Sequence, residues 1–338
     1  MKKSILCATV MLAAAAFVTT IGPAQIALAQ QGKGGGKQNL VAPSVAAGPR
    51  SDDGQIHVLK VQGNIYMLVG APAGNIALQV GDSGVLLVDT MTAAVSDKVV
   101  AAIRTISDKP IRYIINTTFD PDHTGGNANV AKLGAPVVGG NLGNANRGAA
   151  IIASENLANR MSSQTLPAGS LPTVTYFEGQ KELFFNNEGI QVMLAPKAHT
   201  DGDSIVYFRR SDVVVAGDIF LTTTFPVINI EAGGNVNGVI AGLNHVLDLA
   251  IPEHEQEGGT YIIPGHGRLC DEHDVLEYRD MVTIVRDRVQ SMIKKGLTLA
   301  QVKAARPTLD YDGRYGTMPG PGSTDAFVEA VYKSLEKK

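Results

Sequence analysis

The side chains of this chain best suited to bind a metal ion occur in four short segments. They are Asp122-His123, His199, Asp218 and His266. Carboxylate and imidazole groups are suitable ligands for zinc and related divalent ions, and loops distant in sequence can converge on one ion. Each residue also has a structural interpretation, because an aspartate can cap a helix or follow a strand as a turn residue. The residue types alone leave both interpretations open.

The predicted elements place these segments at the ends of strands. Alternating or continuous apolar patterns predict strands over 56–61, 64–69, 75–80, 85–89, 112–116, 191–195, 204–208, 213–216 and 260–263. Helical spacing predicts helices over 96–106 and 236–249, a long helix through Tyr278 and Met292, and a final helix from about Ser323. Each cluster of histidine and aspartate follows an apolar strand, where α/β enzymes usually place their chemistry.

The local motifs carry a resemblance to a known family. Residues 122–127, DHTGGN, resemble the end of the HxHxDHxGGN signature of the metallo-β-lactamase superfamily. Residues 199–202, 217–218 and 265–267 resemble its three later ligand motifs in the same order, and residues 75–89 resemble its opening hairpin. The resemblance implies an α+β fold, a four-layer αββα sandwich with metals at one sheet edge, here followed by a C-terminal helical tail.

The same resemblance implies a ligand set. Carried over by position, Asp122, His123 and His266 would form the family's second metal site. Asp218 would bridge toward the first site, and His199 would be the surviving histidine of that first site.

One segment departs from the family pattern. The first two histidines of the signature fall on Thr118 and Asp120, so the chain reads TxDxDH instead of HxHxDH. Threonine is a poor zinc ligand, whereas Asp120 can still donate an oxygen. We therefore expect one firmly bound Zn²⁺ and a second ion that is weak or absent, with iron or manganese as alternative metals. Asp120 is the candidate for orienting water or taking its proton, and Asp122 is the alternative.

These expectations define a predicted function. The sequence predicts an exported zinc-dependent hydrolase in which metal-bound hydroxide attacks the carbonyl of an ester, thioester, lactone or lactam. Two alternatives stay open on the same fold. One is a non-hydrolytic iron or redox protein, and the other is a binding protein that has lost catalysis with its two histidines.

Composition and charge limit the classes of molecule that the protein is expected to bind. The chain has 338 residues, of which 44% are hydrophobic and 18% charged, so it is not a disordered protein. Its net charge of −3 argues against binding to nucleic acid or anionic lipid through bulk charge. We therefore expect a small-molecule substrate and no nucleic acid, and the sequence indicates no particular oligomeric state.

The start of the chain has the pattern of an export signal. Met1-Lys2-Lys3 precedes an apolar run, and Ala27-Leu28-Ala29 is an A-x-A cleavage signature. The run is too short to span a bilayer, so stable membrane insertion is not expected. Cleavage near Ala29 would remove two lysines and no acidic residue, which leaves a net charge of −5 and Cys270 as the single cysteine. The expected location is the periplasm or the exterior.

The sequence divides into four segments. Residues 1–29 are the predicted signal peptide, and residues 30–55, rich in glycine, proline and small polar residues, are a predicted flexible leader. Residues 56–300 are the predicted metallo-β-lactamase-like domain. Residues 301–338 are expected to form a loop and a packing helix.

Overall fold

The computed structural model describes residues 53–70, 73–136, 148–256 and 258–336. The predicted signal peptide over 1–29 and most of the predicted leader over 30–55 lie outside the described residues. Within those described, no helix is both long enough and apolar enough to cross a membrane.

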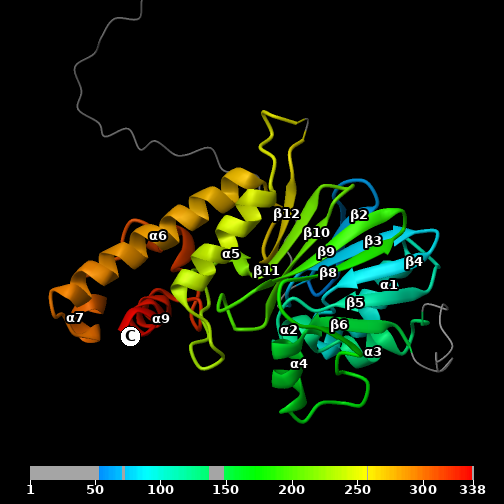
Figure 1. The fold of residues 1–338 in the computed structure, drawn as a ribbon, viewed down its shortest axis with the longest axis horizontal. Coiled ribbons are helices and arrows are strands. Elements are labelled where there is room, and N and C mark those ends of the chain that lie inside the picture. The colour runs from blue at the N-terminus through cyan, green and yellow to red at the C-terminus, as the bar shows by residue number, and fades with distance from the viewer. Residues whose placement is uncertain (1–52, 71–72, 137–147, 257, 337–338) are drawn as a thin grey trace, which may run out of the picture. The chain divides into compact units, whose positions relative to one another are not determined.

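The first half of the described chain forms a seven-stranded sheet (Figure 1). Its strands, in spatial and chain order, are β1 (His57–Lys60), β2 (Ile65–Val69), β3 (Ile76–Gly81), β4 (Gly84–Val88), β5 (Ile111–Ile115), β6 (Ala150–Ser154) and β7 (Val174–Tyr176). Pairing is antiparallel from β1 to β4 and parallel from β4 to β7. Between the parallel strands the chain forms η1 (Ala93–Val95), α1 (Ser96–Arg104), α2 (Pro121–Thr124), α3 (Asn127–Ala131) and α4 (Glu155–Ser162).

The second half forms a five-stranded sheet in the order β12-β11-β10-β9-β8. These strands are β8 (Gln180–Phe185), β9 (Glu188–Ala195), β10 (Asp203–Phe208), β11 (Val213–Leu221) and β12 (Tyr261–His266). Only β11 and β12 pair in parallel, and α5 (Val236–Leu249) connects them. The described chain ends in α6 (Glu272–Lys294), α7 (Leu299–Ala304), α8 (Asp312–Tyr315) and α9 (Thr324–Glu336).

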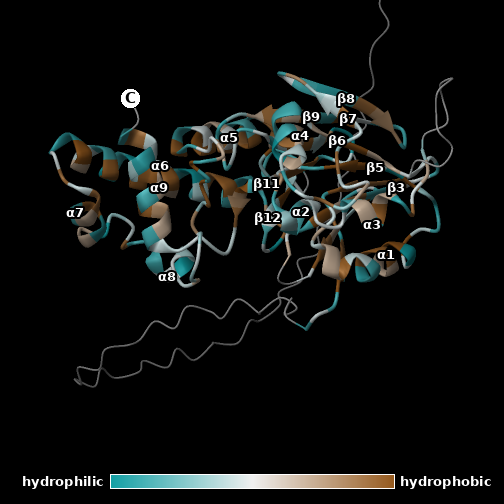
Figure 2. Cartoon of the chain, turned by 90° about the horizontal axis from the view of Figure 1, so that it is seen from below, coloured by the Kyte–Doolittle hydropathy of each residue, from teal (hydrophilic) through white to brown (hydrophobic). Residues whose placement is uncertain are grey.

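The long helix α6 shows why the sequence forms these C-terminal elements. It begins at a capping box, in which Asp271 accepts a hydrogen bond from the Asp274 backbone and Asp274 accepts one from the Asp271 backbone. Its buried residues include Tyr278, Val282 and Val289, which lie on one side of the helix. The hydropathy colouring shows the corresponding alternation of apolar and polar faces along α6 and α9 (Figure 2). The apolar face packs mainly against α5 and α9, and Tyr278 near its start also meets Phe220 of β11. Burial of such a face supplies most of the stability of a helix in a protein.

Three apolar cores separate four layers. The core between the sheets contains Met67, Val88 and Ile115 from the first sheet, and Val192, Val206 and Val215 from the second. The outer face of the first sheet packs under α1 and α3 through Leu87, Ile103 and Val130. The outer face of the second packs under α5 through Val214 and Leu243, and α6 and α9 pack on α5 and extend the same core with Val282 and Val331. The predicted αββα sandwich with C-terminal helices is therefore confirmed.

The strand that carries Asp218 differs from the prediction. The sequence predicts a strand over 213–216 that ends before Asp218, but β11 continues to Leu221. Its pairing with β12 shifts register on both sides of Gly217, which adopts a φ of 52°. An L-residue with a side chain would be strained in this left-handed conformation, and the bulge redirects the strand at Asp218. Asp218 therefore lies inside an irregular strand and not in a turn after it.

Candidate metal centre

Six of the predicted site residues converge in two groups. Asp122, His123 and His266 form one, the two-histidine group, and Asp120, His199 and Asp218 form the other, the one-histidine group. Within each group the potential ligand atoms all lie within 4.8 Å of one another. The residues come from the loop after β5, helix α2, the loop after β9, strand β11 and the end of β12. The two sheets therefore contribute together to both groups.

The two-histidine group is partly open to solvent. His266 Nε2 lies 3.0 Å from Asp122 Oδ2, and these two side chains are 29% and 31% exposed. His123 is fully buried, and its ring meets that of His266 edge to face at a centroid distance of 5.5 Å. Asp120 occupies the N-cap position of α2, which places Asp122 and His123 within its single turn. The capping interpretation of Asp122 is therefore not what the structure shows.

A second buried carboxylate fixes the orientation of His123. His123 Nδ1 donates to Asp89 Oδ2 at 2.8 Å, so that Nε2 faces the cluster. Asp89 in turn accepts hydrogen bonds from the backbone N–H of Thr117, at 2.8 Å, and from its hydroxyl, at 2.6 Å. A Cβ at Gly74 would lie 2.7 Å from His123 Cε1, so the backbone passes the imidazole where only glycine fits. Such outer partners set the tautomer and direction of a ligating histidine.

Asp89 supports His123, but the sequence motifs do not mark it as a site residue. By sequence it is only the last residue of the opening hairpin, and an acid after an apolar strand is also typical of a turn. Its role depends on the approach of α2, which lies far along the chain. Its position directly after the buried strand β4 is the sequence signal that could have marked it.

The one-histidine group is centred on His199. Its Nε2 lies 2.6 Å from Asp120 Oδ2, and its Nδ1 donates to the Val227 carbonyl at 2.8 Å. Thr118, which occupies the position of the family's first histidine, donates its hydroxyl to Asp120 Oδ2 at 3.2 Å. Thr118 thus positions the carboxylate that replaces the second histidine.

Asp218 connects the two groups. Its Oδ1 lies 3.1 Å from His123 Nε2 and 3.8 Å from His266 Nε2, while its ligand atoms also meet those of the one-histidine group. A Cβ at Gly265 would overlap this carboxylate oxygen, so the neighbouring strand β12 needs glycine at that position. The geometry is that of a carboxylate shared by two adjacent sites.

The charges of the cluster are strongly coupled. Burial disfavours charge on both His123 and Asp218, but their mutual attraction outweighs it, raising the pKa of His123 well above its ordinary value and lowering that of Asp218. Burial likewise opposes protonation of His199, but the hydrogen bond to Asp120 raises the pKa of His199 to about 10. Burial would raise the pKa of Asp122, yet the hydrogen bond from His266 lowers it.

These residues fit a divalent cation. Asp122 and Asp218 are held anionic at their ligand positions, and the imidazole nitrogens point at the carboxylates in both groups. A bound cation would take over the charge balance that the imidazole protons provide, because metal binding displaces protons from its ligands. Nitrogen and oxygen donors of this kind suit zinc, iron and manganese.

Cys270 belongs to neither group. Its thiol donates to the Arg268 carbonyl at 3.3 Å, and the side chain is buried in the core beneath α6. Burial raises the pKa of this thiol far above its usual range, so it is held protonated.

The comparisons with known proteins agree with this fold. The profile of the metallo-beta-lactamase superfamily matches residues 69–303, which is most of the chain. The chain belongs to the metallo-β-lactamase superfamily. No curated protein sequence matches it.

Solved structures of the same fold include two kinds of enzyme. The stereoselective inverting sec-alkylsulfatase Pisa1 from Pseudomonas sp. is 15% identical with a TM-score of 0.62, over 82% of this chain and 50% of that one. The chain thus spans about half the length of the alkylsulfatase. DIM-1 metallo-beta-lactamase is 14% identical with a TM-score of 0.52, over 68% of this chain and 97% of that one. A metallo-beta-lactamase from Pontibacter korlensis is also 14% identical, with a TM-score of 0.53 over 68% and 99%.

Proposed function

We propose that this protein is an exported, zinc-dependent hydrolase that acts on a small molecule with a carbonyl or related ester linkage. The observation that carries the proposal is the convergence of two ligand groups that share Asp218. The superfamily hydrolase fold supports it, since the same fold holds β-lactamases and an alkylsulfatase.

The ligands have distinct proposed roles. Asp122, His123 and His266 would hold the firmly bound ion, and Asp120, His199 and Asp218 would hold a second ion more weakly. A bound divalent cation supplies Lewis acidity and lowers the pKa of water at the site. The chain itself supplies orientation, since Asp89 fixes His123 and Thr118 fixes Asp120.

The exposed members of the cluster define the side from which substrate would approach. Asp120, Asp122 and His266 are 25%, 31% and 29% exposed, whereas His123 and His199 are buried. Asp120 and Asp122 are therefore the carboxylates that reach both solvent and the ligand cluster, since Asp218 is only 10% exposed. Either carboxylate can orient a water molecule or accept its proton, which makes them the proposed catalytic residues.

The substrate class is tested by a panel. Purified protein is assayed with a chromogenic β-lactam, a lactone, a thioester, a carboxylic ester and a secondary alkyl sulfate, with zinc content measured on the same sample. The alkyl sulfate is included because the alkylsulfatase match covers more of this chain than the β-lactamase matches do. We expect zinc-dependent turnover of at least one substrate.

The matched variants are His266→Ala and His245→Ala. His245 lies on α5 and belongs to neither ligand group. His266→Ala should lose both metal and turnover, while His245→Ala should keep both. Protein prepared with zinc that retains none would contradict the proposal, bound iron with oxygen consumption would favour the redox alternative, and bound zinc without any turnover would favour a binding protein.

Export is tested separately. The complete chain is expressed with its own first 29 residues, and the amino terminus of the periplasmic product is sequenced. We expect it to begin near Gln30, because Ala27-Leu28-Ala29 has the cleavage pattern. Protein that stays in the cytoplasm with Met1 intact would contradict this part of the proposal.

A further inference from the structure

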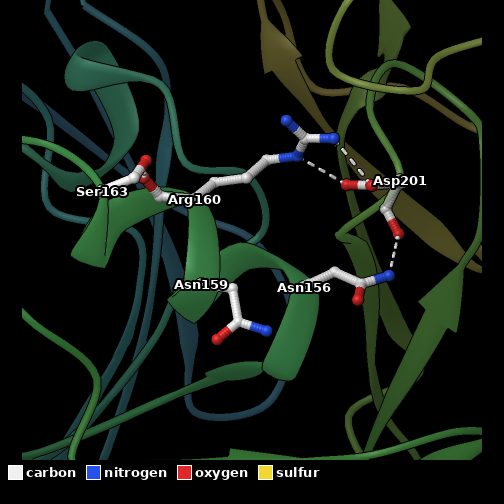
Figure 3. Close-up of a pocket in the computed structure, with 5 residues that line it drawn as sticks. All are labelled: Asn156, Asn159, Arg160, Ser163 and Asp201. Carbon is white, nitrogen blue, oxygen red and sulfur yellow. Dashed lines mark hydrogen bonds and ion pairs between the residues drawn. The ribbon is translucent and has the colours of Figure 1, made fainter.

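Helix α4 carries an arginine, Arg160, whose side chain reaches both the loop of His199 and the loop of Asp120. Arg160 Nε and Nη2 donate to the two carboxylate oxygens of Asp201, each at 2.7 Å. Figure 3 shows the guanidinium directed at Asp201, with Asn156 donating to the Asp201 backbone carbonyl beside it, at 3.0 Å. Asp201 follows the ligand His199 by two positions. The pair therefore fixes the loop that supplies the histidine.

The same guanidinium reaches the loop that supplies the carboxylate. The Arg160 guanidinium carbon lies 5.9 Å from the centre of the Phe119 ring, a cation–π distance. Phe119 directly precedes the ligand Asp120, and it packs with Leu157 and Met161 of α4 in a small apolar cluster. One side chain of α4 thus contacts the neighbours of both ligands.

Helix α4 itself is held closely against the His199 loop. Ser154, its N-cap, donates its hydroxyl to the Gly202 carbonyl at 2.7 Å and accepts from the Leu157 N–H at 3.2 Å. A Cβ at Gly202 would lie 2.7 Å from the Leu157 nitrogen, so the loop and the helix start are in direct contact. Arg160 therefore acts from a fixed position, and a bidentate pair adds directional restraint that a single contact lacks.

We infer that Arg160 is a positioning residue for the one-histidine group: its pair with Asp201 and its contact with Phe119 hold His199 and Asp120 at ligand distance. These two contacts of Arg160 matter because the group lacks two of the family's histidine ligands. The placement of the ligands that remain therefore decides whether an ion binds. Arg160 does not touch the ligand atoms. With Asp201, Asn156, Asn159 and Ser163 it lines an open hollow of about 260 Å³ beside the centre. The inference rests on the proposed use of metal by this site.

The first test measures binding of zinc and manganese, each alone, to chelator-stripped protein by calorimetry and elemental analysis. Arg160→Ala should weaken the ion of the one-histidine group by up to about tenfold, the lower end of the effect of removing an outer partner of a metal ligand, because Arg160 acts through the neighbours of the ligands; the other ion should be unchanged. Arg160→Lys should recover part of the affinity, because an ammonium keeps the charge without the bidentate geometry. The exchanged pair Arg160→Asp with Asp201→Arg should recover more than either single variant.

The control is Arg279→Ala. Arg279 on α6 is 27% exposed, close to the 29% of Arg160. Like Arg160 its guanidinium binds an aspartate, and in addition it binds an asparagine side chain. It lies among the C-terminal helices and contacts neither ligand loop. Its removal should leave both metal affinities unchanged.

A second readout holds even if the wild type binds one ion only. The ring signals of ¹⁵N-labelled histidine in stripped protein should change for His199 in Arg160→Ala and stay in place for His123. Unchanged His199 signals together with unchanged metal affinities would overturn the inference. Equal weakening of both ions would also overturn it, since that result indicates general destabilisation. Failure of the proposed function gives a different result, namely wild-type protein that binds no ion at all.

Discussion

The two ligand groups share one carboxylate but differ in how they are built. The two-histidine group keeps the family's residues, and a buried carboxylate, Asp89, bonds directly to its central imidazole. The one-histidine group has a single imidazole, and its buried carboxylate, Asp203, bonds to the neighbouring Thr200 instead. The comparison teaches that the group without the family histidines is supported indirectly. Thr118 bonds to the remaining carboxylate ligand, and α4 contacts the loops that carry the remaining ligands.

Donor chemistry makes the same distinction. Imidazole-rich sites suit zinc, while sites with more carboxylate shift toward harder ions such as manganese. The one-histidine group offers two carboxylates and one imidazole. We therefore interpret the centre as one site that binds zinc tightly, beside a second site that binds its ion weakly and favours harder ions such as manganese.

Removing a ligand from each group is the strongest way to separate them. His266→Ala should weaken the tight ion by more than about 100-fold, since loss of an outer partner alone costs about 10–100-fold. His199→Ala should remove the weak ion and leave the tight one in place. Titration of stripped protein with zinc checks both, and equal loss in the two variants would show that the groups do not act separately.

The support behind the tight site gives the next largest effect. Asp89→Asn keeps the shape of the side chain but removes the charge that faces His123 Nδ1. Tight-ion affinity should fall by about 10–100-fold, with the weak ion changed less.

Asp212→Asn is the matched control for Asp89→Asn, because Asp212 is also buried and accepts a threonine hydroxyl, from Thr260, but lies in neither ligand group. Zinc calorimetry on the two variants supplies the measurement. An Asp89→Asn protein with wild-type affinity would show that Asp89 is only a structural residue.

The buried carboxylate near the weak site, Asp203, should make the stability of the protein depend on pH. Burial is the main cause that raises the pKa of Asp203 from 3.8 to about 6. The folded state therefore holds this proton more tightly than the unfolded state, so stability from Asp203 is complete below about pH 4 and falls as pH rises through 6. One pKa unit corresponds to about 1.4 kcal/mol, which sets the change on the order of 3 kcal/mol.

The measurement is urea unfolding of stripped wild type and Asp203→Asn between pH 4 and pH 7. The wild type should lose stability relative to the variant across that window and then level off. If the stability of the wild type relative to Asp203→Asn stayed constant or rose with pH, the assignment would be contradicted.

Much of the fold and most of the centre could be predicted from the sequence. Asp122, His123, His199, Asp218 and His266 sit in short motifs at strand ends, and the resemblance of these motifs to the family signature predicts them as ligands. Asp89 was not found, because its partner His123 reaches it only after α2 folds against β4. Residues 150–185, which form β6, α4, β7 and β8, received no prediction. These elements are only three to eight residues long, which is too short to establish a clear period.

The absence of α4 from the sequence prediction has a direct consequence for the site. Arg160 is one of many surface arginines by sequence, and only the approach of α4 to both ligand loops gives it a role. Tertiary proximity of this kind carries no local signal, whereas a ligand motif does.

Two adjacent threonines give the smallest and sharpest test of the comparison. Thr117 donates its hydroxyl to Asp89, behind the tight site, and Thr118 donates its hydroxyl to Asp120, in the weak site. Both side chains are 1% exposed, and valine preserves their shape while removing the hydroxyl. Each change removes one hydrogen bond, worth about 1 kcal/mol or roughly a fivefold change in affinity.

The two variants are controls for each other, because they differ by one position and make the same chemical change. Thr118→Val should weaken the ion of the one-histidine group and spare the other, and Thr117→Val should do the reverse. Competition titrations with zinc and manganese on both proteins resolve a fivefold difference. If both variants weakened the same ion, the threonines would not divide between the groups, and the separation drawn from their hydrogen bonds would fail.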